Sequence, residues 1–185
     1  MKQTLGFLFI LSIILSCTNS QNDTIDTLAI QDSLRLDSIN KAQALVSVDA
    51  KSWLIKSIEN EFSDPRFENE NQDKKPSIYT PAYEEYKTDA ISIDFDGGIT
   101  EEKFKEKWSG KYDTKYAGIG NGFLIAIQDW GKVKVTTCNL KTVATADTLL
   151  FDVVLEDTEF KAKYKRDIKI VKSGNSYLID DVLEY

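Results

Sequence analysis

The sequence predicts an α+β fold in which N-terminal helices pack on one face of a curved antiparallel sheet of about four strands. In the first part of the domain, Leu54, Ile58 and Phe62 lie four residues apart, which places one apolar stripe on a helix face. Beyond Gly110 the pattern changes to an alternation with a period of two, as in 132–136. Helices first and hairpin-linked strands afterwards are typical of an α+β domain.

Three helices are expected before residue 110. Asp49 can cap the first, and Ser-Asp-Pro at 63–65 ends it. Thr80 supplies a capping hydroxyl for the second, followed by a proline at the first helical position. Thr100 opens the third, which carries two aromatic residues four positions apart on its inner face.

The strand-like segments of the second half are short and regularly spaced. Gly174 and Asn175 are expected to supply the positive φ angles of a hairpin turn within 172–176. The apolar or alternating segments that we expect to form strands are 123–128, 132–136, 149–155, 160–165 with 168–170, and 177–179.

The N-terminus has the pattern of an export signal. A single cation, Lys2, precedes an uncharged apolar run over 5–16, which is too short to cross a hydrocarbon core of about 30 Å. The residues Ile-Leu-Ser-Cys at 14–17 resemble the lipobox of bacterial lipoproteins, although many lipoboxes have Leu where this chain has Ile14. The resemblance implies cleavage before Cys17, a diacylglycerol on its thiol and an acylated amino group, which together anchor a protein firmly. The alternative is an ordinary secretory signal with a cysteine near its end by chance.

The chain is expected to divide into a signal peptide (1–16), a lipidated tether (17–46) and one α+β domain (47–185). Apolar residues recur sparsely over 23–46, which fits a stalk helix, a weak coiled coil or a disordered spacer. Thr18 is not the Asp that retains some lipoproteins at the inner membrane, and 18–22 contains no acidic run resembling a surface-export signal. We therefore expect an outer-membrane protein that faces the periplasm.

Composition excludes several classes of chemistry. The chain has no His, so His-based nucleophilic catalysis and His-bearing zinc or iron sites are excluded. If Cys17 carries lipid, Cys138 has no disulfide partner and is expected to be a small buried apolar residue. The net charge is −7, and it becomes −8 when Lys2 leaves with the signal peptide, which argues against nucleic acid as a partner. No cofactor is expected.

The segments 99–104, 122–131 and the closing 177–182 (Tyr-Leu-Ile-Asp-Asp-Val) resemble the cone-shaped nuclear-transport-factor-2-like superfamily. The likeness is closest to lipoprotein domains of that superfamily that are common in the Bacteroidota, and it covers roughly 47–185. This superfamily hosts enzymes, ligand carriers and protein-binding modules, so the resemblance implies a fold and leaves function open.

Two loops contain candidate ligands. The segment 92–103 resembles a calcium loop, with Asp94, Asp96 and Gly97 at positions three, five and six. Lys103 stands where the bidentate Glu is needed, so we expect a turn between helices and no metal site. The glycine-rich segment 118–122 is expected to be a turn or bulge, with a ligand loop as the alternative.

Asp129, Trp130 and Tyr116 are the candidate ligand-binding residues. Asp129, beside Trp130 inside a cone-shaped fold, could have a raised pKa and act as an acid. The alternative is that Asp129 is an ordinary acid in a turn and that Trp130 is a core aromatic residue. We expect a non-enzymatic binding module that recognises an envelope protein or a small apolar ligand. The alternative is an isomerase- or hydrolase-type enzyme that uses Asp and Tyr.

Overall fold

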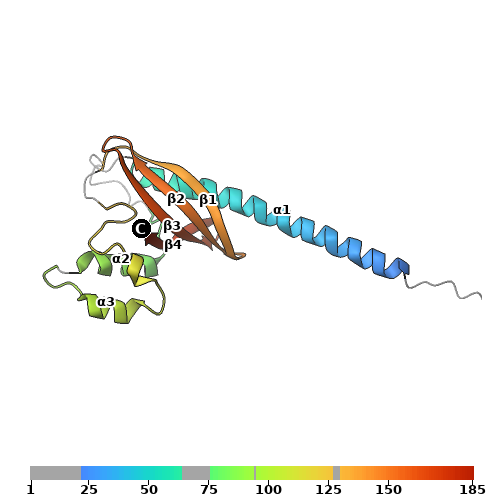
Figure 1. The fold of residues 1–185 in the computed structure, drawn as a ribbon, viewed down its shortest axis with the longest axis horizontal. Helices are drawn as coiled ribbons and strands as arrows, with labels where there is room; N and C mark the ends of the chain where they lie inside the picture. Colours follow the sequence, from blue (N-terminus) through green and yellow to red (C-terminus); the bar gives the residue numbers. More distant parts are fainter. Residues whose placement is uncertain (1–21, 64–75, 94, 127–129) are drawn as a thin grey trace, which may run out of the picture. The chain divides into compact units, whose positions relative to one another are not determined.

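The computed structural model describes residues 22–63, 76–93, 95–126 and 130–185 (Figure 1). The chain separates into two compact units, 1–41 and 42–185, and helix α1 (Asn22–Glu61) belongs to both. Cys17 and Asp94 lie outside the described residues, as does Asp129. Within the described residues, no helix is both long and apolar enough to cross a bilayer.

α1 is longer than the sequence pattern predicted. Asp49 lies exposed inside the helix and does not cap it, so the predicted start was wrong. The reason is that 22–61 contains neither Gly nor Pro, and nothing interrupts the helical hydrogen bonds before Glu61. Of the three states left open for 23–46, the structure has the helix.

The two later helices begin where predicted. α2 (Pro81–Ser92) is capped by Thr80, whose hydroxyl accepts a hydrogen bond from the Tyr83 N–H. α3 (Glu101–Trp108) is capped in the same way by Thr100. A 3₁₀ turn, η1 (Thr114–Tyr116), follows α3. The two aromatic residues predicted for the inner face of α3, Phe104 and Trp108, are buried, and so are Tyr83 and Tyr86 of α2.

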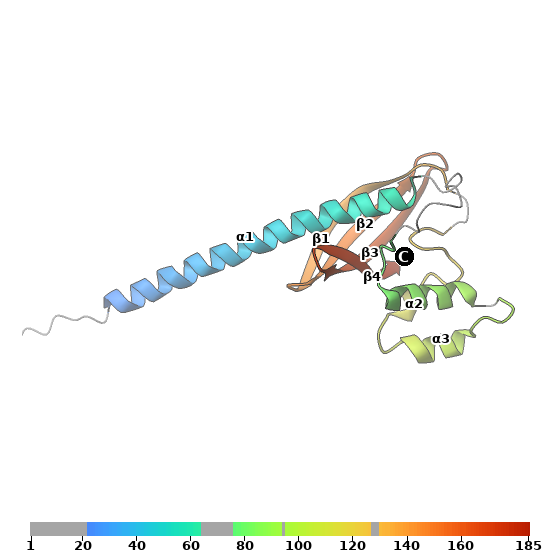
Figure 2. The same cartoon turned by 180° about the vertical axis from the view of Figure 1, so that it is seen from behind.

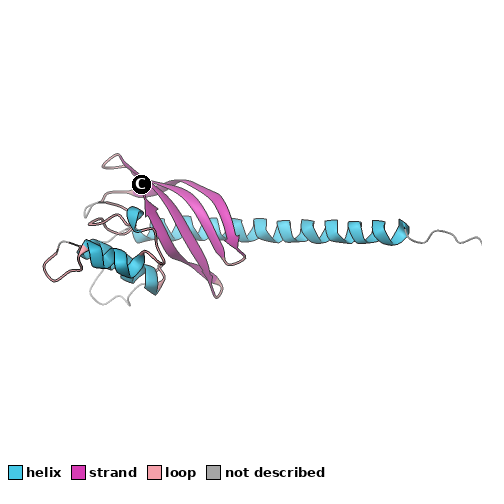
Figure 3. Ribbon diagram, turned by 60° about the horizontal axis from the view of Figure 1, so that its bottom comes forward, coloured by secondary structure: helices cyan, strands magenta, loops and turns pink. Residues whose placement is uncertain are grey.

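The second half forms a four-stranded antiparallel sheet that does not close (Figure 3). Its order is β1 (Val133–Thr145), β2 (Thr148–Asp157), β3 (Ala162–Ser173) and β4 (Ser176–Glu184), each pairing with the next. The predicted α+β class is therefore confirmed. Of the segments expected at 160–165 and 168–170, residues 162–165 and 168–170 are parts of the single strand β3, whereas 160–161 lie in the turn before it.

Two local predictions were wrong. No strand forms at 123–126, because Leu124 has a φ of 67° and the Ile125 N–H bonds to the Phe123 carbonyl at 2.8 Å, a tight turn that interrupts an extended chain. In the β3–β4 hairpin only Gly174 has a positive φ, of 58°, whereas Asn175 does not.

The domain's helices cover a face and an edge of the sheet. The end of α1 runs along one face, α2 lies beside β4, and α3 lies beside α2 (Figure 2). The segment before α2 extends the sheet, because the Thr80 N–H bonds to the Ile179 carbonyl at 2.8 Å. At the opposite edge, the Glu59 carboxylate accepts the Val135 N–H at 3.1 Å.

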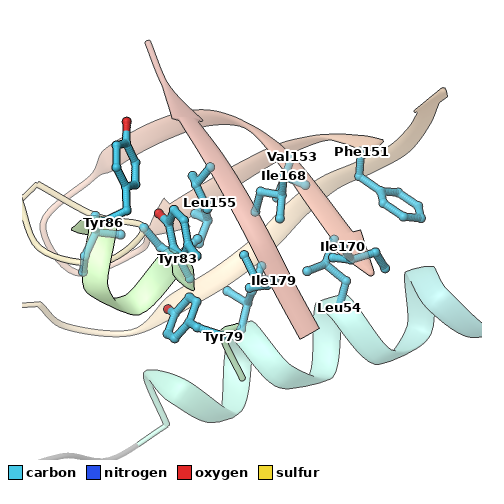
Figure 4. Packing of buried hydrophobic residues seen from close by; sticks show 14 of the residues in the cluster. Leu54, Tyr79, Tyr83, Tyr86, Phe151, Val153, Leu155, Ile168, Ile170 and Ile179 are labelled. Carbon is cyan, nitrogen blue, oxygen red and sulfur yellow. The ribbon is translucent and has the colours of Figure 1, made fainter. Parts of the chain in front are cut away.

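The core lies between α1 and the sheet. On β2 every second residue is buried, so Leu149, Phe151, Val153 and Leu155 face one side. Leu54 of α1 points toward this layer (Figure 4). Cys138 is buried and free, as expected, and burial raises the pKa of its thiol to about 11. The face of the sheet that α1 covers is thus filled by side chains.

Candidate ligand-binding site

Three charged side chains meet inside the domain, between α2, β3 and β4. Lys87 of α2 is fully buried, Arg166 of β3 is 3% exposed and Glu184 of β4 is 8% exposed. Arg166 and Glu184 are register partners on adjacent strands, which brings their side chains to the same face. Buried charges persist only when they are paired and hydrogen-bonded, so the partners of this group determine its role.

Lys87 uses its ammonium group to tie the loop after η1 to the last strand. Its Nζ bonds to the carbonyls of Ala117 at 2.8 Å and Gly118 at 3.0 Å, and it forms an ion pair with Glu184 Oε1. Gly118 has a φ of 58°, and a Cβ there would lie 2.2 Å from the carboxylate carbon of Glu184. The glycine-rich segment is therefore a turn built against the buried carboxylate, which explains why it needs glycine.

Arg166 is held mainly by backbone oxygens. Its Nε donates to the Leu124 carbonyl and its Nη1 to the Lys165 carbonyl, both at 2.9 Å. Its Nη2 reaches Glu184 Oε2 at 3.3 Å, and Asn121 Nδ2 donates to the same oxygen at 3.3 Å. Both contacts are at the long end of the hydrogen-bond range. The tight turn at Leu124 thus has a role, since it presents a carbonyl to Arg166.

The trio contains two cations and one carboxylate. Burial lowers the pKa of Lys87, and the attraction of Glu184 offsets only part of that effect. Burial also lowers the pKa of Arg166, again against the opposing influence of Glu184. The positive charge of the trio therefore exceeds its negative charge.

A cavity of about 340 Å³ is lined by Arg166 and Glu184 of this trio, and we call it the basic pocket. Two aromatic rings of its lining lie close to cations: the Arg166 guanidinium lies 5.5 Å from the Tyr164 ring centre, and the Nζ of Lys165, which is not part of the lining, lies 5.7 Å from that of Tyr185. The residues that line the pocket are Lys115, Gly118, Ile119, Asn121, Ala126, Lys163, Tyr164, Arg166, Glu184 and Tyr185.

The residues predicted to bind ligand do not form one site. Tyr116 contacts the Tyr185 ring, 5.1 Å between centres, and so lies beside the basic pocket. Trp130 lines a different cavity of about 210 Å³, together with Phe62, Tyr79 and Phe123 among others. The predicted acid, Asp129, lies outside the described residues.

The candidate calcium loop has the geometry of a turn. Asp96 is exposed, and Gly97 takes a φ of 82° between α2 and α3. The loop borders a shallow hollow that also includes Phe95 and Lys103, the residue at the last ligand position. No group of three or more acidic, Cys or His side chains is placed to hold a metal ion in the described part of the chain.

Two residues of the buried trio occupy positions in the sequence pattern that are expected to be apolar. Lys87 follows Tyr83 by four residues and precedes Ala90 by three, so it occupies the apolar stripe of α2. Arg166 likewise takes an inward position in the alternation that leads to Ile168. A charge at a core position requires a partner, and a search for such positions would have selected both residues.

Among the described carboxyl groups, that of Asp181 has a raised pKa. Burial raises the pKa of Asp181 from its ordinary value of 3.8 to about 6, despite lowering by Lys169 and the Val182 N–H, and Asp180 and Asp113 raise it further. Its Oδ1 is buried without a hydrogen-bond partner among the described residues. Its folded pKa lies above its unfolded value, so its destabilising effect is absent below about pH 4 and complete above about pH 6.

We therefore expect Asp181→Asn to raise the free energy of unfolding by about 1–2 kcal/mol at pH 8 and to change it little at pH 4. Urea unfolding at both pH values measures this. Asp180→Asn is the matched control: it removes an ion pair with Lys169 at 3.0 Å and should bring no gain. An equal gain at both pH values would show that Asp181 destabilises through packing and not through its charge.

Comparison of the chain with protein-family models, with curated proteins and with solved structures found no match to any of them, so the case for function rests on the basic pocket and on the residues that build it.

Proposed function

We propose that this chain is a lipid-anchored protein of the bacterial cell envelope whose domain binds a small molecule in the basic pocket and catalyses no reaction. The signal-like residues 1–16 and the lipobox-like 14–17 support the anchor at Cys17. The absence of an acidic run after Cys17 favours the periplasmic face of the outer membrane. An open sheet with a helix along one face is compatible with a nuclear-transport-factor-2-like domain, which is our proposal for the finer fold.

The observation that carries the binding function is the basic pocket itself. Its floor is fixed by buried hydrogen bonds from Lys87 and Arg166, so the cavity exists before a ligand arrives. A volume of about 340 Å³ suits a small molecule and not a polymer. A preformed site of this kind loses little conformational entropy on binding.

An isomerase- or hydrolase-type enzyme is the second candidate, and Asp181 is the observation that favours it. This carboxyl has a pKa near neutrality, and its charge acts on the pKa of Tyr86 and Tyr112. However, Asp181 lines none of the three pockets described above. Burial raises the pKa of both tyrosines, which makes them weaker acids. The basic pocket is therefore the better supported site, and we propose binding without catalysis there.

Mass spectrometry of the full chain, purified in mild detergent from membranes of its own host, tests the anchor and the ligand together. Under denaturing conditions we expect the mass of a lipidated chain that begins at Cys17. Under native conditions we expect a further small mass that denaturation removes. Cys17→Ser should lose the covalent lipid, and Tyr164→Ala, in the pocket wall, should lose the small mass.

Phe160→Ala is the matched control for the pocket variant. Phe160 lies on the β2–β3 connection close to Tyr164, but it is 59% exposed and does not line the pocket. It should retain the small mass. A stoichiometric protein partner without any small mass would contradict ligand binding and would favour an interaction module instead.

A further inference from the structure

We infer that the ligand of the basic pocket is a small organic anion, with a carboxylate or phosphate group attached to an aromatic or apolar body. This inference rests on the proposed function, because it names the chemical class of the molecule that the same pocket binds.

The first argument is charge. Lys87 and Arg166 share one buried carboxylate, which leaves one positive charge in the trio, of which Arg166 and Glu184 line the pocket. Lys115 and Lys163 add two further cations to the lining, and Lys163 is partly compensated by Glu156 at 3.1 Å. This excess of positive charge stands in a chain whose net charge is −7. An anion in the pocket would supply the missing countercharge.

A neighbouring acid does not supply it. Asp167 is buried next to Arg166 in the chain, yet its Oδ2 accepts a hydrogen bond from the Tyr185 hydroxyl at 2.7 Å and forms an ion pair with Lys141. The charge of Asp167 is therefore paired with that of Lys141. Glu184 is the single carboxylate that the described ion pairs assign to Lys87 and Arg166.

The second argument is hydrogen-bonding capacity. Arg166 makes two short bonds to backbone carbonyls but only one contact, at 3.3 Å, with Glu184. A guanidinium has five N–H donors and prefers paired contacts with a carboxylate or phosphate. Asn121 Nδ2 also reaches Glu184 at 3.3 Å. A ligand anion could improve on both long contacts while Lys87 keeps Glu184 in place.

The third argument concerns the rest of the ligand. The rings of Tyr164 and Tyr185 line the cavity, and Ile119, which is 39% exposed, adds an aliphatic wall. Such surfaces pack against a flat or apolar group, while the cations of the lining hold the charged group. The pocket therefore suits an amphipathic anion better than a bare inorganic ion.

A series of probes that differ in charge tests the inference. Benzoate, phenyl phosphate, benzamide and benzylammonium share one ring and carry negative, negative, zero and positive charge. Binding to the full chain in detergent is measured by calorimetry and by the shift in melting temperature at low and high salt. We expect benzoate or phenyl phosphate to bind at least about tenfold more tightly than benzamide, and to weaken as salt rises.

The double variant Lys115→Gln/Lys163→Gln should weaken anion binding by about three- to tenfold without loss of folding, since both lysines are exposed. The matched control is Lys103→Gln/Lys105→Gln on α3, which removes two exposed cations that do not line this pocket. It should bind the anions as the unmodified chain does.

Benzamide or benzylammonium binding as tightly as benzoate would overturn the inference and leave the proposed function standing, because the pocket would then take an uncharged or cationic ligand. Anion binding that the pocket variant and the α3 variant weaken equally would also overturn it. Failure of all four probes would overturn it too. The native mass measurement then reports separately whether the chain carries any small molecule, which decides the proposed function.

Discussion

Glu184→Gln is expected to lower the free energy of unfolding by about 3–5 kcal/mol, a large share of the stability of a domain of this size. The substitution keeps the size of the side chain but removes the one carboxylate that, among the described residues, pairs with Lys87 and Arg166. Two buried cations would then face each other without a countercharge. Urea unfolding followed by circular dichroism at neutral pH measures the loss.

The control for this variant is Glu101→Gln on α3. Glu101 also forms an ion pair, with Lys105, but its side chain is half exposed and the pair lies on the surface. Its loss should cost less than about 1 kcal/mol. A similarly small cost for Glu184→Gln would contradict the prediction and would show that the carbonyls around Lys87 satisfy its charge without Glu184.

A double variant identifies the cause of the Glu184 effect. Lys87→Met removes one of the two cations, so Lys87→Met/Glu184→Gln should lose less stability than the sum of the two single changes. Strict additivity would mean that the two side chains act through packing and not through their charges.

Asp157→Ala is expected to cost about 3 kcal/mol, the second largest effect. Asp157 is fully buried at the end of β2, and its carboxylate accepts three backbone N–H bonds, from Gly131 at 2.8 Å, Glu159 at 2.9 Å and Phe160 at 3.0 Å. These bonds join the β2–β3 turn to the chain that enters β1. Without the carboxylate, three amide groups lose a charged acceptor.

The same site predicts a pH dependence. Burial by itself would raise the pKa of Asp157, but the three N–H bonds outweigh it and hold the pKa below 3.8. A carboxyl whose folded pKa is depressed stabilises the protein above its unfolded pKa, and that contribution is lost as pH falls through the folded value. The difference in unfolding free energy between the unmodified chain and Asp157→Ala should therefore shrink below about pH 4.

Asp147→Ala is the control for the Asp157 variant. Asp147 lies in the β1–β2 turn at the opposite end of the sheet and is exposed. Its substitution should change stability by less than about 0.5 kcal/mol and leave the pH dependence intact. An equally small loss of stability for Asp157→Ala would contradict the prediction. It would mean that water replaces the carboxylate as acceptor for all three amides.

The sequence alone determined the features that depend on local rules. Thr80 and Thr100 were identified as helix caps because a hydroxyl before the first helical turn satisfies amides that have no other partner. The apolar run from Leu149 to Leu155 identified a buried strand, and the structure shows that alternate residues of it are buried. The change from helical to alternating spacing gave the α+β class without knowledge of which strand pairs with which.

Local patterns were insufficient where a segment's conformation is set by distant partners. The apolar run that begins at Phe123 has the composition of a strand, but it turns at Leu124 and presents a carbonyl to Arg166 on β3. α1 continues past the expected boundary at Asp49, because a cap is effective only where the preceding residues leave the helix.

The candidate site was decided by the tertiary structure. Lys87, Arg166 and Glu184 lie on α2, β3 and β4, and nothing in their spacing along the chain indicates that they meet. The sequence shows charges at positions of a buried periodicity, which implies that each needs a partner. Which partner each charge has is decided by the packing of α2 against β4 and by the pairing of β3 with β4. The same packing places the unbalanced positive charge of the trio beside a cavity. The physical reason is that secondary structure follows from neighbours in the chain, whereas the free energy of a buried charge depends on groups that only the fold brings together.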